Sequence, residues 1–124
     1  MTPKQIEKVE NWLAALRSGK YKQGKIMLYD RNNDTYCCLG ILCRTNNLPM
    51  KKNSSRETDF VFPNTKMLCG MPDSTWFEET TGFPFTFAEK LARCNDDESM
   101  PFKNIADVIG IEMLARSVPK NENS

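Results

Sequence analysis

The sequence predicts a small single domain of the α+β class, mostly helical with a short antiparallel β-hairpin or sheet. Its 124 residues suffice for one domain, and 40% hydrophobic with 27% charged residues is typical of a globular chain. Apolar residues recur at helical spacing near both ends of the chain, and two short strand-like runs joined by turn residues lie between them. We expect the domain to span residues 1–119, followed by a polar tail at 120–124.

The first helix is expected to begin at Pro3, because Thr2 and Gln5 form a capping box and proline is favoured in the first turn. Apolar residues three and four positions apart give it one buried face, made by Ile6, Val9, Leu13 and Leu16. Gly19 is placed to end the helix in the left-handed conformation. The polar, basic stretch 20–25 that follows is expected to be flexible.

Residues 26–29 and 35–38 are predicted to form a β-hairpin, since turn-forming residues separate two short apolar runs. The apolar run 39–43 either extends the second strand or begins a helix. We favour a short helix that ends at 46–47, because asparagine tolerates a left-handed cap. The polar stretch 49–59 is predicted to be a loop, and residues 60–62 a short strand.

Two more helices are predicted in the second half of the chain. Thr86 and Glu89 form a second capping box, which opens a helix that ends near Cys94. The last helix begins near Ser99 and ends before Pro119. One face of this last helix is apolar, made by Phe102, Ile105, Ala106, Ile109 and Met113. For the aromatic residues between 60 and 87, the favoured role is contact in the core or in a dimer. Among them, Phe83 and Phe85 flank a proline and are expected to be the most exposed.

The composition excludes several classes of site. Because the chain has no histidine, it can form neither a Ser–His–Asp nor a Cys–His catalytic pair, and no histidine zinc site. The spacing of its five cysteines does not favour a four-cysteine zinc site, so we expect free, mostly buried thiols, with a reactive thiolate at Cys37 or Cys38 as the alternative. We expect no cofactor and no bound metal.

The net charge of +1 conceals two oppositely charged parts. Residues 1–56 contain 11 basic and 4 acidic residues, whereas residues 57–124 contain 6 basic and 12 acidic residues. A net charge so close to zero makes nucleic acid an improbable partner. The N-terminus has no apolar signal segment and no stretch is apolar enough for a membrane span, so we expect a cytoplasmic protein with no membrane partner.

The basic stretch is the first candidate site. Lys20, Lys22 and Lys25 surround Tyr21, with Arg17 one turn earlier, and such a group suits a phosphate beside a stacked base. The alternative is an ordinary solvated loop. The turn 95–98 is another candidate, since its acidic side chains could hold Mg²⁺ or Ca²⁺ and the Asn95 amide could contact a base. The alternative is that it is only a turn between helices, with acids placed before the last helix, where the helix dipole favours them. The candidate ligand-binding residues are Arg17, Lys20, Tyr21, Lys22, Lys25, Tyr36, Asn95 and Asp96.

Three stretches carry a family resemblance: WLAALRSGKYKQG at 12–24, YCCLGILC at 36–43, and RCNDDESMPFKNIADVI at 93–109. Together they resemble a family of small tailed-phage and prophage proteins, for which no activity is established, and only residues 48–85 follow the family pattern loosely. The resemblance implies a viral protein that acts in the cytoplasm of a bacterial host.

Three functions remain open, in this order. The first is a non-catalytic counter-defence protein that sequesters a small nucleotide-type immune signal, such as a cyclic dinucleotide. The second is a protein–protein inhibitor of a host enzyme or defence protein, whose oppositely charged halves form complementary faces. The third is a metal-dependent nucleotide hydrolase that uses Asp96 or Asp97. Because one small chain offers limited concave volume, a homodimer or higher homo-oligomer is also expected.

Overall fold

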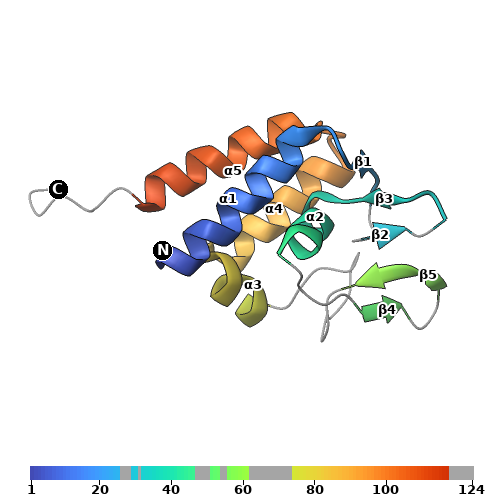
Figure 1. Cartoon of the computed structure of the whole chain (residues 1–124), viewed down its shortest axis with the longest axis horizontal. Coiled ribbons are helices and arrows are strands. Elements are labelled where there is room, and N and C mark those ends of the chain that lie inside the picture. The colour runs from blue at the N-terminus through green and yellow to red at the C-terminus, as the bar shows by residue number, and fades with distance from the viewer. Residues whose placement is uncertain (26–28, 31, 47–50, 54–55, 62–73, 118–124) are drawn as a thin grey trace, which may run out of the picture.

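The computed structural model describes residues 1–25, 29–30, 32–46, 51–53, 56–61 and 74–117. The helices pack together at one end of the molecule, and the strands lie at the other end (Figure 1). This arrangement is the α+β class that the sequence predicts. None of the helices in the described part of the chain is long and apolar enough to cross a membrane.

Helix α1 (Pro3–Ser18) confirms the predicted capping box and C-cap. The backbone N–H of Gln5 donates to Thr2 Oγ1 at 3.2 Å, and the Thr2 N–H donates to Gln5 Oε1 at 2.8 Å. Gly19 ends the helix with a φ of 75°, a conformation that glycine adopts without a steric cost. The indole N–H of Trp12, which has no exposed surface, donates to the Cys38 carbonyl at 2.7 Å and ties α1 to α2 (Cys38–Thr45).

The predicted hairpin is confirmed for β2 (Tyr29–Asp30) and β3 (Thr35–Tyr36), which pair antiparallel with Tyr29 opposite Tyr36. The order of the whole sheet is β1-β3-β2-β5-β4, where β1 is Lys22–Gln23, β4 is Lys51–Asn53 and β5 is Arg56–Val61. The short strand predicted at 60–62 is confirmed for residues 60–61, which end β5, and the remaining strands of the sheet were not predicted.

The additional strands correct two predictions. The stretch 20–25, expected to be flexible, contains β1, which pairs parallel with β3, so the sheet is mixed. The stretch 49–59, expected to be a loop, contains β4 and most of β5, which pair antiparallel. Every residue of β1 and β4 is polar, and so are the first four residues of β5, so these stretches lack the alternation of apolar and polar residues by which a strand is recognised.

Helix α2 forms over the predicted apolar run, and its residues 38–43 are all buried. Its end differs from the prediction, because Asn46 has a φ of −108° and is not in the left-handed conformation. The side chain performs the capping instead, since Asn46 Nδ2 donates to the Leu42 carbonyl at 3.2 Å. A carbonyl left free at the helix end is thereby satisfied.

The second half of the described chain contains α3 (Ser74–Thr81), α4 (Phe85–Asp96) and α5 (Phe102–Ser117). No helix was predicted over residues 74–81, where α3 lies. Helix α4 begins after Pro84 without a side-chain cap, so the predicted capping box at Thr86 is wrong. Thr86 lies inside the first turn of α4 and therefore cannot be its N-cap. The N-terminal end of α4 is instead bound by a residue of α3, since Glu78 Oε2 accepts from the Phe85 N–H at 3.2 Å.

The hydrophobic core lies between α1, α2, α4 and α5, and α3 adds the fully buried Phe77 to it. Phe83 has no exposed surface and packs edge-on against Phe87 with ring centroids 4.9 Å apart, so the prediction of an exposed Phe83 is wrong. Phe85 is half-buried. The largest side chains with almost no exposed surface are Trp12, Phe77, Phe83, Leu16, Leu39, Ile41, Leu42, Leu91, Ile105 and Ile109.

Candidate functional site

The basic stretch after α1 is held in place by the turn between α4 and α5. Gln23 Nε2 donates to Asn95 Oδ1 at 2.9 Å and to the Met100 carbonyl at 2.7 Å, and Gln23 Oε1 accepts from the Phe102 N–H at 3.2 Å. Asn95 Nδ2 donates to the Gly24 carbonyl at 2.9 Å. These bonds connect residues more than 70 positions apart, so they fix where the stretch lies relative to the helices.

Gly24 allows the stretch to approach the hairpin closely. Its N–H donates to the Tyr36 carbonyl at 2.7 Å. A Cβ atom at this position would lie 2.4 Å from Thr35 Oγ1, which is closer than any real contact. Only glycine therefore lets the backbone after β1 lie against β3 in this way.

All three tyrosines of the chain meet beside this strand pair. The rings of Tyr29 and Tyr36 lie 4.7 Å apart, as expected for residues opposite each other on antiparallel strands. Tyr21 meets Tyr36 edge-on at 5.5 Å. Tyr36 is 9% exposed, whereas Tyr21 and Tyr29 are half-buried, so Tyr36 is the centre of the cluster.

A cleft of about 290 Å³ opens beside these rings, and we call it the tyrosine cleft. Its lining comes from the residues between α1 and β1, β1, the turn before β3, β3 itself and the last turn of α2. The lining residues are Lys20, Tyr21, Lys22, Asn33, Asp34, Tyr36 and Arg44. Three cations from two distant stretches of the chain thus line a cleft beside one aromatic cluster.

Among the described residues that line the tyrosine cleft, Asp34 is the one carboxylate. It has a φ of 52°, a conformation that aspartate tolerates better than most residues, and its Oδ1 accepts from the Tyr29 hydroxyl at 3.0 Å. Burial raises the pKa of Tyr36; the Arg44 guanidinium opposes this shift and the Asp34 carboxylate adds to it. The Tyr36 hydroxyl therefore stays protonated at neutral pH and can donate a hydrogen bond.

The structure brings together four of the eight candidate residues in this cleft: Lys20, Tyr21, Lys22 and Tyr36. Arg17 instead pairs with Asp107 on α5 at 3.2 Å, and Lys25 donates to the Ser99 hydroxyl. Asn95 has no exposed surface, and one amide hydrogen is directed to Gly24 while the other bonds the half-buried Asp96 at 2.8 Å. Arg17, Lys25, Asn95 and Asp96 therefore lie outside the tyrosine cleft.

Arg44 was missed by the sequence analysis. It is the exposed basic residue in the last turn of α2, a position where a cation also interacts favourably with the helix dipole. The predicted helix over 39–46 is mostly apolar, so its one charged residue has to point away from the core. This signal could have identified Arg44 as an exposed cation. Its approach to Lys20 and Lys22 depends on the fold.

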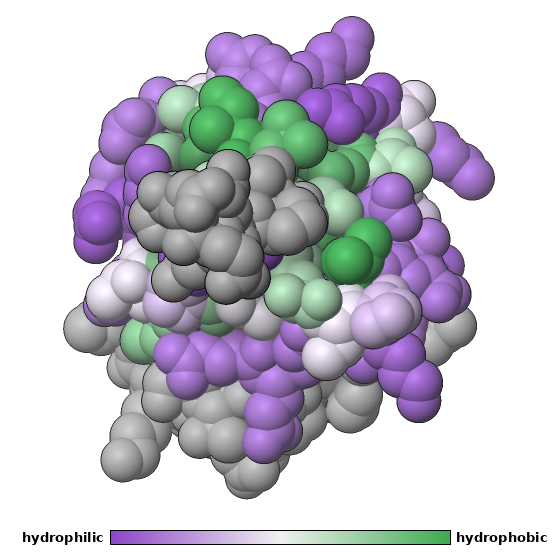
Figure 2. Space-filling view, turned by 90° about the vertical axis from the view of Figure 1, so that its left-hand side faces the viewer, coloured by the Kyte–Doolittle hydropathy of each residue, from purple (hydrophilic) through white to green (hydrophobic). Residues whose placement is uncertain are grey.

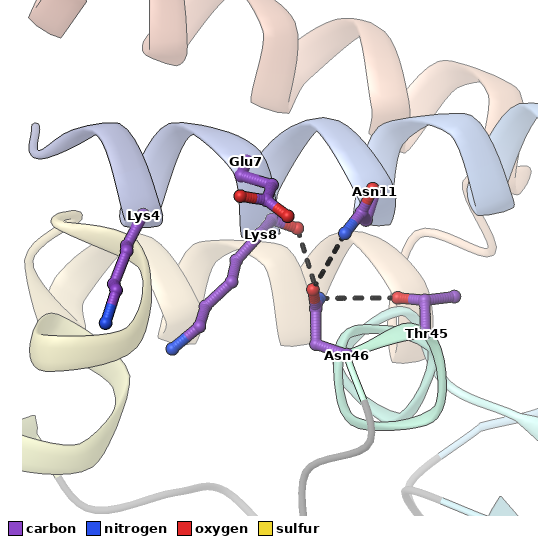
Figure 3. A pocket seen from close by; sticks show the side chains of 6 residues that line it. All are labelled: Lys4, Glu7, Lys8, Asn11, Thr45 and Asn46. Carbon is purple, nitrogen blue, oxygen red and sulfur yellow. Dashed lines mark hydrogen bonds between the residues drawn. The ribbon is translucent and has the colours of Figure 1, made fainter.

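A second hollow, of about 390 Å³, lies between α1 and the end of α2 (Figure 3). Lys4 and Lys8 reach into it, and the described residues that line it include no aromatic side chain. Its amides are used to join the helices, since Asn46 Nδ2 donates to the Lys8 carbonyl at 3.1 Å and Asn11 Nδ2 donates to Asn46 Oδ1 at 3.2 Å. The tyrosine cleft is therefore the stronger candidate for a ligand with both charge and a ring.

The described cysteines, Cys37, Cys38, Cys43 and Cys94, are free and buried. Burial raises the pKa of Cys37 to about 12, and it raises the pKa of the other three as well. Cys37 caps α2 without a side-chain hydrogen bond to the helix. Within the described ranges, no group of three or more Cys, Asp or Glu side chains could hold a metal ion.

These thiols are expected to react slowly in the folded protein. The test uses a Cys69→Ser variant, whose remaining cysteines are the four described ones. A thiol reagent at pH 8 should modify the native variant roughly 100-fold more slowly than the urea-unfolded chain. The reason is that a raised thiol pKa leaves little thiolate and burial blocks access of the reagent. Rapid modification of one thiol in the native protein would instead support the reactive-thiolate hypothesis.

Comparison with known proteins identifies one family. A family model described as "Domain of unknown function (DUF8296)" matches residues 4–113, which include the tyrosine cleft and all of the helices except their outermost ends. No curated protein and no solved structure matches the chain.

Proposed function

The chain belongs to the DUF8296 family, and we propose that it binds a small ligand of the nucleotide type in the tyrosine cleft and holds it without chemical change. The convergence of Lys20, Lys22 and Arg44 on the ring of Tyr21 carries this proposal. Lysine and arginine bind phosphate through charge-assisted hydrogen bonds, and an aromatic ring is a stacking surface for a base.

The volume of the cleft sets the size of the ligand. At about 290 Å³ it lies at the lower end of the range of roughly 300–1,000 Å³ that is usual for small-molecule sites. This volume suits a mononucleotide or one half of a cyclic dinucleotide. A complete dinucleotide would extend beyond the cleft.

The side chains of the cleft favour binding over catalysis. Asp34 accepts a hydrogen bond from Tyr29, and the Tyr36 hydroxyl is protonated at neutral pH. Within the described lining, neither forms a nucleophile–base pair with another residue, so no arrangement there supports catalysis through a protein nucleophile. Together with the resemblance to phage proteins, this favours a counter-defence role in the bacterial cytoplasm, in which the protein sequesters a nucleotide immune signal of the host.

The test is to mix the protein with a panel of mononucleotides and cyclic dinucleotides, follow its melting temperature, then denature the protein and identify the released compound. We expect at least one member to raise the melting temperature and to be recovered intact. A recovered product would favour the hydrolase hypothesis, and no shift with any member would contradict nucleotide binding.

A further inference from the structure

Helix α5 has apolar residues on two faces, which is unusual for a helix at the surface of a domain. Its inner face packs on α1 and α4 through Phe102, Ile105, Ala106 and Ile109. Ile111 and Leu114 point outward and are 70% and 65% exposed; no other large apolar side chain described by the structure is classed as exposed. Packing in the core explains the apolar residues of the inner face. The outer face, with Ile111 and Leu114, has no partner within the described part of the chain.

The outer face forms a broad hollow of about 630 Å³ with the neighbouring surface of α1. We call it the α1/α5 patch; it is lined by Glu10, Leu13, Arg17, Asp107, Gly110, Ile111, Met113 and Leu114. Figure 2 shows apolar surface gathered in the upper part of this end of the molecule, where α5 lies, with hydrophilic surface around it. Single exposed apolar residues are common, but two large ones three positions apart beside a hollow mark an interaction surface.

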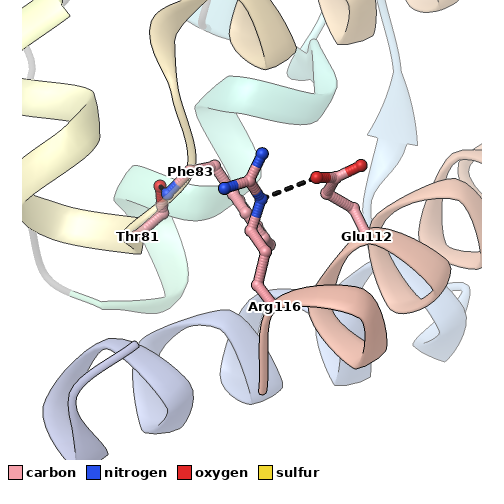
Figure 4. Close-up of polar contacts among 4 residues, drawn as sticks. All are labelled: Thr81, Phe83, Glu112 and Arg116. Atoms are coloured by element: carbon pink, nitrogen blue, oxygen red, sulfur yellow. Dashed lines mark hydrogen bonds and ion pairs between the residues drawn. The ribbon is translucent and has the colours of Figure 1, made fainter. Parts of the chain in front are cut away.

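The charges around the patch have a definite order. Along α1, acidic Glu10 is followed two turns later by basic Arg17. Arg17 pairs with Asp107 of α5 at 3.2 Å, because the two helices run in opposite directions (Figure 1). Arg116 is held by Glu112, one turn earlier on α5, at 2.6 Å, and neither of these two residues lines the patch (Figure 4). Along α1, the patch is therefore acidic at one end and basic at the other.

We propose that the α1/α5 patch binds a second copy of this chain about a two-fold axis through the middle of the patch. A half-turn exchanges the two ends of each helix, so it places Arg17 opposite Glu10 of the second copy. The same rotation places Ile111 near Leu114 of the second copy. A two-fold interface requires a self-complementary surface, and this order of charges supplies one.

The size of the patch sets the expected strength. A stable interface buries about 800 Å² on each partner, whereas the patch offers two large exposed apolar side chains, Ile111 and Leu114. We expect a dissociation constant in the micromolar range. The interface does not include the tyrosine cleft, so a test of the dimer does not test the proposed function, and the reverse also holds.

The first test is the molar mass by analytical ultracentrifugation over about 1–500 µM protein, which brackets a micromolar dissociation constant. The wild-type protein should change from monomer to dimer across this range. Leu114→Glu should weaken dimerisation roughly tenfold or more, because it buries a charge at the centre of the interface. The control is Thr86→Glu on α4, an exposed site with the same change of charge, which should dimerise like the wild type. Because both positions are exposed, melting temperatures should confirm that both variants fold.

The second test examines the two-fold arrangement itself. Glu10→Arg and Arg17→Glu should each weaken dimerisation, since in either homodimer the two positions then carry the same charge. An equimolar mixture of these two variants should form a heterodimer, because both contacts then join opposite charges. A wild-type protein that stays monomeric, or a dimer that survives Leu114→Glu, overturns the proposal, as does a mixture that stays monomeric when the wild type dimerises.

Discussion

Replacing Asn95 by alanine is expected to lower the free energy of unfolding by about 2–4 kcal/mol, although the substitution removes only one small amide group. The side chain has no exposed surface and makes three hydrogen bonds, to Gln23, the Gly24 carbonyl and Asp96. Alanine leaves the Gly24 carbonyl without this donor in a buried place, and water cannot replace the donor without a cavity to enter. The same change releases the stretch that contains Lys20 and Lys22 from the turn between α4 and α5.

The matched control is Asn104→Ala, at an exposed asparagine in the first turns of α5, which should change the free energy of unfolding by less than about 0.5 kcal/mol. Asn95→Asp should be as damaging as Asn95→Ala, because a carboxylate cannot donate to the Gly24 carbonyl. Urea unfolding measures all three. If Asn95→Ala and Asn104→Ala are equally stable, the network does not hold the stretch as described.

Replacing Arg44 by glutamate is expected to weaken binding of a mononucleotide roughly 10- to 100-fold, which corresponds to the loss of one charge-assisted contact to phosphate. The new carboxylate would also repel the phosphate in a cleft that already contains Asp34. Arg44 is exposed, so the variant should still fold, with a melting temperature only a few degrees lower because a carboxylate replaces the cation at the C-terminal end of α2. Isothermal titration calorimetry with the tightest-binding nucleotide of the panel measures the change.

Two comparisons make this prediction specific to the cleft. Lys90→Glu makes the same change of charge at an exposed site on α4 outside the cleft and should leave the affinity within about twofold, since salt screens distant charges. Arg44→Lys should fall between the wild type and Arg44→Glu, because lysine keeps the charge but loses the planar fork of donors. Equal affinities for Arg44→Glu and Lys90→Glu would place the ligand elsewhere.

The predictable parts of the fold depend on local signals. The ends of α1 follow from Thr2, Gln5 and Gly19, because a capping box and a left-handed glycine act through residues only a few positions apart. The hairpin of β2 and β3 follows from the turn residues between them. Predictions for residues 62–73 and for the tail at 120–124 lie outside the described residues.

The parts that could not be predicted depend on distant contacts. Strand β5 pairs with β2 across more than 20 positions of sequence, and its polar residues show no apolar alternation. At the start of α4, Glu78 from the preceding helix bonds the Phe85 N–H, so the local capping signal at Thr86 was misleading. In both cases a partner far along the chain decides the local structure.

The candidate site shows the same division. The basic stretch suggested one cluster of cations, but the end of α1 and the short strand β1 direct its side chains to different places. Arg17 faces α5, Lys25 contacts the turn at Ser99, and Lys20 and Lys22 line the cleft. Arg44 joins them from α2, and only the folded chain shows that contribution.

The central claim, that the tyrosine cleft binds a nucleotide, is tested most directly by an NMR titration of the labelled protein with adenosine and guanosine monophosphate. The account predicts saturable changes in the backbone signals of residues 20–22, 33–36 and 44 with at least one of the two compounds. Changes centred on Lys4 and Lys8 in the hollow between α1 and α2, or no change with either compound at millimolar concentration, would contradict it.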